Sequence, residues 1–129
     1  MRASGTFQVN LSPQPLTIEH ESNLNAGRMN IDKTFEGPLQ GKTSGEMLSV
    51  MNNERSAGGY VAIEIFKGSL NGLSGSFAFQ HYGKFDSSDQ SLLLEVVPGS
   101  GEGDLVGISG KMIIRNEGKQ HYYDFDGEV

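Results

Sequence analysis

A short glycine-rich phrase occurs twice in this chain, 35 residues apart, and each copy precedes a run with the alternation of a β-strand. It reads G-S-L-N-G-L-S-G over residues 68–75 and G-D-L-V-G-I-S-G over residues 103–110. A looser copy over residues 37–45 needs one inserted residue. Glycine permits the close backbone approach and positive φ that sharp bends require. The repeat therefore predicts an antiparallel β-protein that bends strongly enough to close on itself.

Alternation of polar and apolar residues continues through the rest of the chain, and no window of helical length shows helical periodicity. Short turns between the segments favour an antiparallel meander, folded as a sandwich or a barrel. The glycines at strand starts favour the barrel. We therefore predict an all-β fold, a closed or nearly closed antiparallel barrel of about eight strands, in a single domain over residues 1–129. The expected strands cover residues 6–11, 16–20, 28–36, 45–51, 60–66, 75–85, 92–97, 110–115 and 121–125, with a loop at 21–27.

Composition narrows the classes of function. The net charge is -6 and the charges are dispersed, which argues against nucleic acid or anionic membranes as partners. The chain has no cysteine, so disulfides, thiolate metal sites and a cysteine nucleophile are excluded. Its three histidines are far apart in the sequence, and we expect neither a metal nor a cofactor. No segment has the pattern of a signal peptide or a membrane span, so we expect a cytoplasmic protein.

Several motifs together resemble a family of small bacterial proteins of unknown function. They include G-G-Y-V-A-I-E at residues 58–64, the repeat with S-F-A-F-Q-H at 76–81, A-S-G-T-F at 3–7, I-D-K-T-F-E-G at 31–37, V-V-P-G-S-G at 96–101 and H-Y-Y-D-F at 121–125. The resemblance covers nearly the whole chain. It implies a closed eight-stranded antiparallel barrel similar to that of allene oxide cyclase. It implies no activity, because the family has none assigned.

The two copies of the repeat align residues 77, 79 and 81 with residues 112, 114 and 116, and the shared face is apolar until its last position. We expect this face to point into the barrel, which places His81 at the inner end of the row that begins with Phe77 and Phe79. A histidine in such a place suits a general base or a pH-sensitive hydrogen bond. The alternative is a core histidine that bonds a backbone carbonyl.

Lys33 shares the apolar face of its strand with Phe35. Because a buried lysine is costly unless it is paired, its side chain either reaches the rim or meets a carboxylate. Glu64 and Glu95 are the expected partners, since each lies in an apolar row. With His81 they predict a pocket that moves protons or binds a polar head group. The alternative is an internal ion pair with other charges at the rim.

We expect a small-molecule-binding barrel that holds an apolar or amphipathic ligand in its lumen. The alternatives are a cofactor-independent isomerase or cyclase, and a structural barrel that acts as a homo-oligomer. The strand of Glu64, residues 60–66, looks buried on both faces, which would suit a strand that lines the barrel with one face and forms an interface between subunits with the other. The last strand carries an aromatic row that either cradles a ligand or belongs to the core. The candidate pocket consists of Lys33, Phe35, Glu64, Phe77, Phe79, His81, Glu95 and Tyr123, with Phe125 as a further wall.

Overall fold

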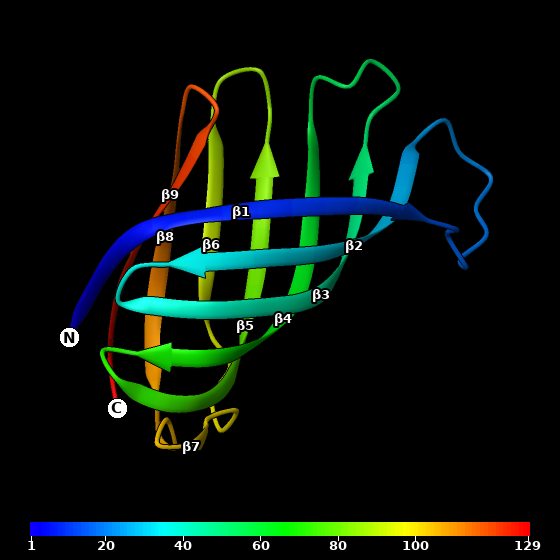
Figure 1. Cartoon of the computed structure of the whole chain (residues 1–129). Helices are drawn as coiled ribbons and strands as arrows, with labels where there is room; N and C mark the ends of the chain where they lie inside the picture. The colour runs from blue at the N-terminus through cyan, green and yellow to red at the C-terminus, as the bar shows by residue number, and fades with distance from the viewer.

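The computed structural model describes residues 1–129 and contains only strands, turns and loops (Figure 1). In chain order the strands are β1 (Arg2–Gln14), β2 (Asn25–Glu36), β3 (Leu39–Met51), β4 (Gly58–Leu70), β5 (Leu73–Phe85), β6 (Gln90–Val96), β7 (Glu102–Gly103), β8 (Ser109–Glu117) and β9 (Gln120–Glu128). The chain forms no helix that would span a membrane.

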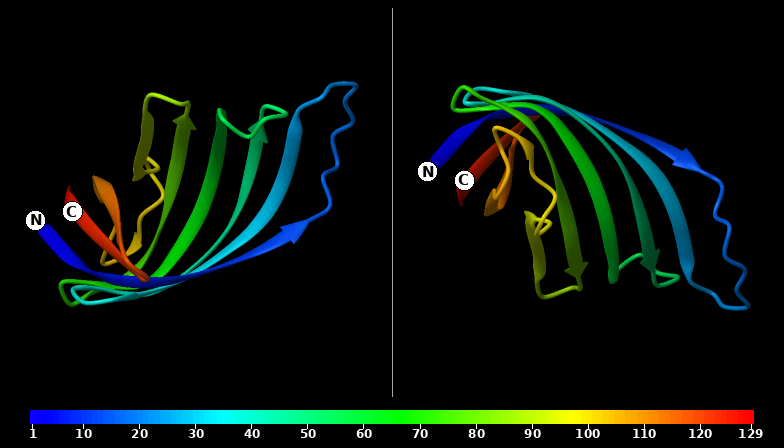
Figure 2. Two further views of the ribbon diagram at one scale, coloured as in Figure 1. Left: turned by 90° about the horizontal axis from the view of Figure 1, so that it is seen from above. Right: turned by 90° about the horizontal axis from the view of Figure 1, so that it is seen from below.

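The strands pair in the order β4-β3-β2-β1-β9-β8-β6-β5, and pairing of β4 with β5 closes this sheet into an eight-stranded barrel. Every pairing is antiparallel, and the short β7 adds a contact beside β5. Figure 2 shows the strands curving around the barrel and the loop after β1 extending away from both termini. The predicted fold class is confirmed.

The predicted strand at residues 16–20 is wrong. β1 continues through Pro13 to Gln14, and the chain then forms a loop until β2 begins at Asn25. Proline is tolerated in β1 because β9 pairs only with residues 2–7, so Pro13 has a strand neighbour on one side alone. The alternation of residues 16–20 therefore belongs to a loop, whose Leu16 and Ile18 side chains line a hollow beside Leu48 and Val61.

The glycine-rich copies form the connections β2–β3, β4–β5 and β7–β8, at one end of the barrel (Figure 1). Backbone hydrogen bonds hold these connections together: Asn71 N–H donates to the Pro38 carbonyl over 2.9 Å, and Asp104 N–H donates to the Ser74 carbonyl over 2.8 Å. The leucine at the third position of each copy is fully buried in the core; these are Leu39, Leu70 and Leu105. The repeat thus closes one end of the barrel with leucine side chains.

Glycine is required by the backbone at two of these places. Asn71 and Gly72 have φ of 49° and 85° and form the two-residue hairpin turn between β4 and β5. Gly41 and Gly68 face each other where β3 and β4 bend. A Cβ atom on Gly68 would lie 2.1 Å from the Gln40 carbonyl oxygen and 2.7 Å from the Gly41 Cα atom. Any side chain here would force the two strands apart.

Aromatic rings fill the middle of the barrel. The ring centroids of Phe77 and Phe79 are 4.9 Å apart, and that of Phe66 lies 5.0 Å from Phe77. Phe35 and Tyr123 pack edge to face at 5.4 Å. All five side chains are at most 1% exposed. Because a cavity able to hold water would expose the rings that line it, the lumen at this level is a packed core.

The Tyr123 hydroxyl ties the last strand to the β2–β3 turn. It accepts a hydrogen bond from the Leu39 N–H over 3.1 Å. Its own O–H group is within donating distance of two carbonyl oxygens, that of Glu36 at 3.0 Å and that of Leu39 at 3.1 Å. The residue is fully buried, so no water replaces these bonds.

We predict that Tyr123→Phe lowers the free energy of unfolding by about 1–3 kcal/mol, because it leaves buried backbone groups without a partner. Urea denaturation followed by circular dichroism measures this loss. The matched control is Tyr122→Phe, since the Tyr122 hydroxyl has no hydrogen-bond partner in the chain and its ring faces Arg115 at the surface. Equal stability of the two variants would contradict the prediction.

Candidate functional site

A buried polar network lies just beyond the aromatic core and joins four neighbouring strands. Glu64 on β4 is 1% exposed, and its Oε2 atom accepts a hydrogen bond from Lys33 Nζ on β2 over 3.0 Å. Its Oε1 atom accepts a bond from Thr43 Oγ1 on β3 over 2.7 Å. The Nε2 atom of His81 on β5 also bonds Oε2. Both carboxylate oxygens are therefore used within the protein.

Two further features stabilise this network. The Lys33 ammonium lies 5.1 Å from the centroid of the Phe7 ring, a cation–π contact in a desolvated place. Gly45 faces Glu64 across the β3–β4 pair, where a Cβ atom would lie 3.0 Å from the Glu64 Cγ atom. The absence of a side chain at residue 45 thus makes room for the glutamate.

Burial by itself would raise the pKa of Glu64. The hydrogen bond from His81, the charge of Lys33, the charge of His81 and the bond from Thr43 together outweigh burial and lower the pKa from 4.5 to about 2. Glu64 is consequently a carboxylate at neutral pH, and its function in this geometry is to hold the surrounding side chains in place. It is poorly suited to exchange protons near neutrality.

The structure brings together Lys33, Glu64 and His81, as the sequence predicted. Thr43 was not predicted. Its position between Gly41 and Gly45, two inward-facing residues of the looser copy over residues 37–45, indicates that it also faces inward. The aromatic members of the predicted pocket lie in the packed core and do not line an open space; they are Phe35, Phe77, Phe79, Tyr123 and Phe125.

The predicted place of Glu95 in this pocket is wrong. Leu94 and Val96 are buried, so alternation turns Glu95 to the outer face of β6. Its Cα atom lies opposite those of Gln80 and Lys111. The apolar neighbours that suggested a buried row are themselves on the outside, since Leu93 is an exposed leucine of the same face.

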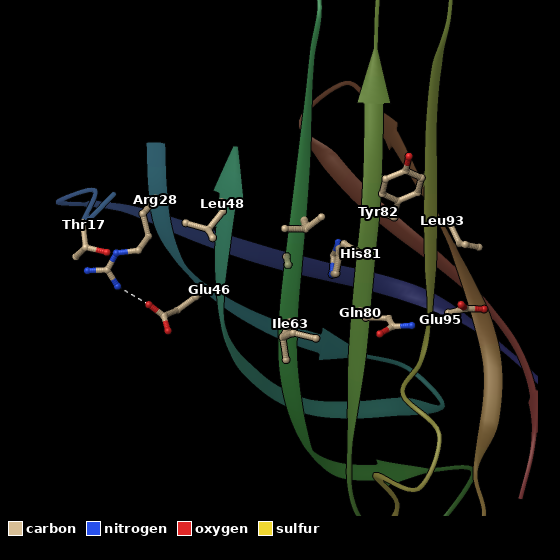
Figure 3. Close-up of a pocket in the computed structure, with 12 residues that line it drawn as sticks. Thr17, Arg28, Glu46, Leu48, Ile63, Gln80, His81, Tyr82, Leu93 and Glu95 are labelled. Carbon is tan, nitrogen blue, oxygen red and sulfur yellow. Dashed lines mark hydrogen bonds and ion pairs between the residues drawn. The ribbon is translucent and has the colours of Figure 1, made fainter. Parts of the chain in front are cut away.

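A hollow of about 570 Å³ lies on the outer face of β2–β6, and we call it the outer hollow (Figure 3). Figure 3 places Arg28, Glu46 and Thr17 along one side and Leu93 and Glu95 along the other. The Arg28 guanidinium is held there, because its Nη1 bonds Glu46 over 2.5 Å and its Nε bonds the Pro15 carbonyl over 3.1 Å. The remaining lining residues are Leu48, Val61, Ala62, Ile63, Gln80, His81 and Tyr82.

A second hollow of similar volume continues the first one toward the loop after β1. It shares Leu48, Val61 and Tyr82 with the outer hollow, and the loop contributes Leu16 and Ile18. Together the two hollows form one connected, largely apolar surface.

β4 has an unusual distribution of side chains between its two faces. It buries Glu64, but exposes Val61, Ile63 and Ile65 by 50%, 48% and 61%. The inner face also contains Ala62, Phe66 and Leu70, so β4 is apolar on both faces around Glu64. In a single chain the outer face of β4 is therefore open to solvent, and its burial against a second subunit stays a prediction. An exposed aliphatic surface of this extent is typical of a binding surface.

Acid should remove the contribution of Glu64 to stability. Since its pKa is lowered on folding, this contribution is complete above about pH 4.5 and is lost as the pH falls toward about 2. We predict that Glu64→Gln lowers the free energy of unfolding at pH 7 by on the order of 3 kcal/mol, because it also leaves Lys33 buried without its counter-ion. Guanidinium denaturation at several pH values should show that the difference from wild type shrinks below pH 4.5.

The matched control for this measurement is Glu46→Gln, which removes a carboxylate from the exposed pair with Arg28. It should change the free energy of unfolding by at most about 1 kcal/mol. A Glu64→Gln difference that stayed constant down to pH 2 would mean that the carboxylate does not stabilise the fold through its charge.

Comparisons with known proteins give one family and no activity. Residues 3–126 match the family described as "Protein of unknown function (DUF3224)". The fold is similar to the crystal structure of a protein with unknown function from this family, from Shewanella oneidensis MR-1, with a TM-score of 0.94 and 43% sequence identity over 100% of this chain and 97% of that chain. The curated proteins gave no match, and the likeness to allene oxide cyclase stays a prediction. The chain belongs to the DUF3224 family of proteins of unknown function.

Proposed function

We propose that this protein binds an uncharged, largely apolar small molecule in the outer hollow. The observation that carries the proposal is the orientation of β4, which exposes Val61, Ile63 and Ile65 while it buries Glu64. Exposing these aliphatic side chains costs stability, and such costs are typical of functional surfaces. The volume of about 570 Å³ lies within the usual range for ligand pockets.

The chemistry of the outer hollow indicates the ligand class. Leu48, Val61, Ile63 and Leu93 supply an aliphatic lining, and the Tyr82 ring adds a flat apolar surface. The Arg28 charge is already matched by Glu46, and Glu95 forms no ion pair in the chain, so an anion finds no free cation here. The uncharged polar groups that remain for a ligand are those of Gln80 and Thr17. These features favour a neutral molecule with one hydrogen-bonding group.

This proposal moves the ligand from the lumen, where the sequence placed it, to the outside of the sheet. The packed aromatic core argues against a ligand in the lumen, since the rings expose no surface. The buried network also offers little to the alternative of an isomerase or cyclase, because Glu64 stays ionised and both of its oxygens are bonded.

The test compares two dyes, neutral Nile red and anionic anilinonaphthalene sulfonate. We expect Nile red to bind with a blue-shifted emission, and the anionic dye to bind more weakly. Ile63→Asn should weaken Nile red binding by on the order of tenfold, because it replaces aliphatic lining with an amide. Fluorescence titration measures both affinities.

The matched control is Ile113→Asn, since Ile113 on β8 is also an exposed isoleucine of the outer face but does not line the outer hollow. It should leave Nile red binding unchanged. Native mass spectrometry before and after denaturation would also reveal a co-purified ligand as a mass surplus. The proposal fails if neither dye nor any co-purified molecule binds, or if both substitutions weaken binding equally.

A further inference from the structure

We infer that a second copy of this chain covers the outer hollow, with a twofold axis running along β4. This inference deepens the proposed function and rests on it: the hollow becomes an enclosed binding site only when the partner closes it. The register of the outer face places complementary side chains symmetrically about β4.

The register arranges the outer-face residues at and beside the outer hollow in two rows across the strands. One row contains Arg28, Leu48, Val61, Tyr82 and Leu93, on β2, β3, β4, β5 and β6 in turn. The second row contains Asn30, Glu46, Ile63, Gln80 and Glu95 on the same strands. β4 is therefore the central strand of the five, and its aliphatic residues lie at the middle of each row.

A twofold axis along β4 places each row opposite the same row of the partner, with the strands in reverse order. Leu48 on β3 then faces Tyr82 of the partner subunit on β5, so two exposed apolar side chains line the enclosed space together. Glu46 faces Gln80 of the partner subunit across the same space, so the axis opposes a carboxylate to an uncharged amide and not to a second carboxylate. Such an interface is self-complementary, as a twofold interface must be.

The outer strands complete the charge complementarity. Arg28 and Asn30 on β2 come to lie against the partner's β6, where Glu95 has no ion pair of its own. Within one chain these two charges are four strands apart. Asn30 then faces Glu95 of the partner subunit within the second row, and Arg28 lies in the adjacent row, opposite Leu93 of the partner subunit. Both charges thus come together at the rim, around the aliphatic lining.

The two surfaces meet at their rims because each is hollow between them. The partner copy thus supplies the missing wall, and Val61 and Ile63 line the enclosed space from both sides. This accounts for the exposure of these two side chains in the single chain, since they become shielded from water in the dimer.

The experiment measures the mass of the protein in solution by light scattering during size-exclusion chromatography. The wild type should have about twice the subunit mass of 14.0 kDa. Val61→Glu should raise the dissociation constant of the dimer by on the order of 100-fold, because it sets two like charges against each other across the axis. The matched control Ile113→Glu changes another exposed aliphatic residue of the outer face, on β8, and should remain a dimer.

A double-mutant cycle with Arg28→Gln and Glu95→Gln tests the axis itself. Each single substitution should raise the dissociation constant of the dimer. The factor for the double variant should be several-fold smaller than the product of the two single factors, since the two side chains interact only between subunits. A monomeric wild type, a Val61→Glu variant that remains a dimer, or independent effects in the cycle would overturn the inference. A monomer that binds Nile red would leave the proposed function standing, whereas a dimer that binds neither dye nor any co-purified molecule would support this inference and overturn the proposed function.

Discussion

The buried carboxylate of Glu64 determines which face of β4 points into the barrel. Its partners come from β2, β3 and β5, so one network joins four neighbouring strands. A slip of any of these strands by one residue would move its member of the network to the opposite face and leave the others buried without a partner. Loss of a buried charge partner is among the larger single costs in a small protein. The network therefore specifies register where hydrophobicity alone would not.

This specification matters most on β4, because both of its faces are apolar. The inner face contributes Ala62, Phe66 and Leu70 to the interior, whereas the outer face has the β-branched residues 61, 63 and 65. Phe66 and Leu70 fit the aromatic core and the leucine-filled end, and Glu64 fixes the same orientation from within. The aliphatic residues on the outside are thus a consequence of how the barrel is closed, and they are available for recognition.

The sequence predicts the barrel well because its inner faces repeat. The alternation correctly assigns residues 31, 33 and 35 of β2, residues 77, 79 and 81 of β5, and residues 121, 123 and 125 of β9 to the inner face. It fails at Glu95, since alternation groups residues by face without stating which face is buried. It also fails at residues 16–20, because a segment can alternate without pairing with another strand. The pairing of Lys33 with Glu64 was predictable because a buried lysine needs a carboxylate. The third hydrogen-bond partner of that carboxylate is Thr43. It was not predicted, because it lies in the looser copy of the glycine-rich phrase, where alternation is less clear.

The size of the barrel also explains why side chains fill the lumen of this chain. An eight-stranded barrel has an interior that side chains alone can fill, unless small residues line it. Here the glycines that face inward lie at the bends, where strands approach each other, and the wide middle of the barrel receives phenylalanine and tyrosine. The residues that permit closure are thus small and the residues that fill the barrel are large. A protein built in this way has its free apolar surface on the outside of the sheet, and the ligand site proposed above lies on that surface.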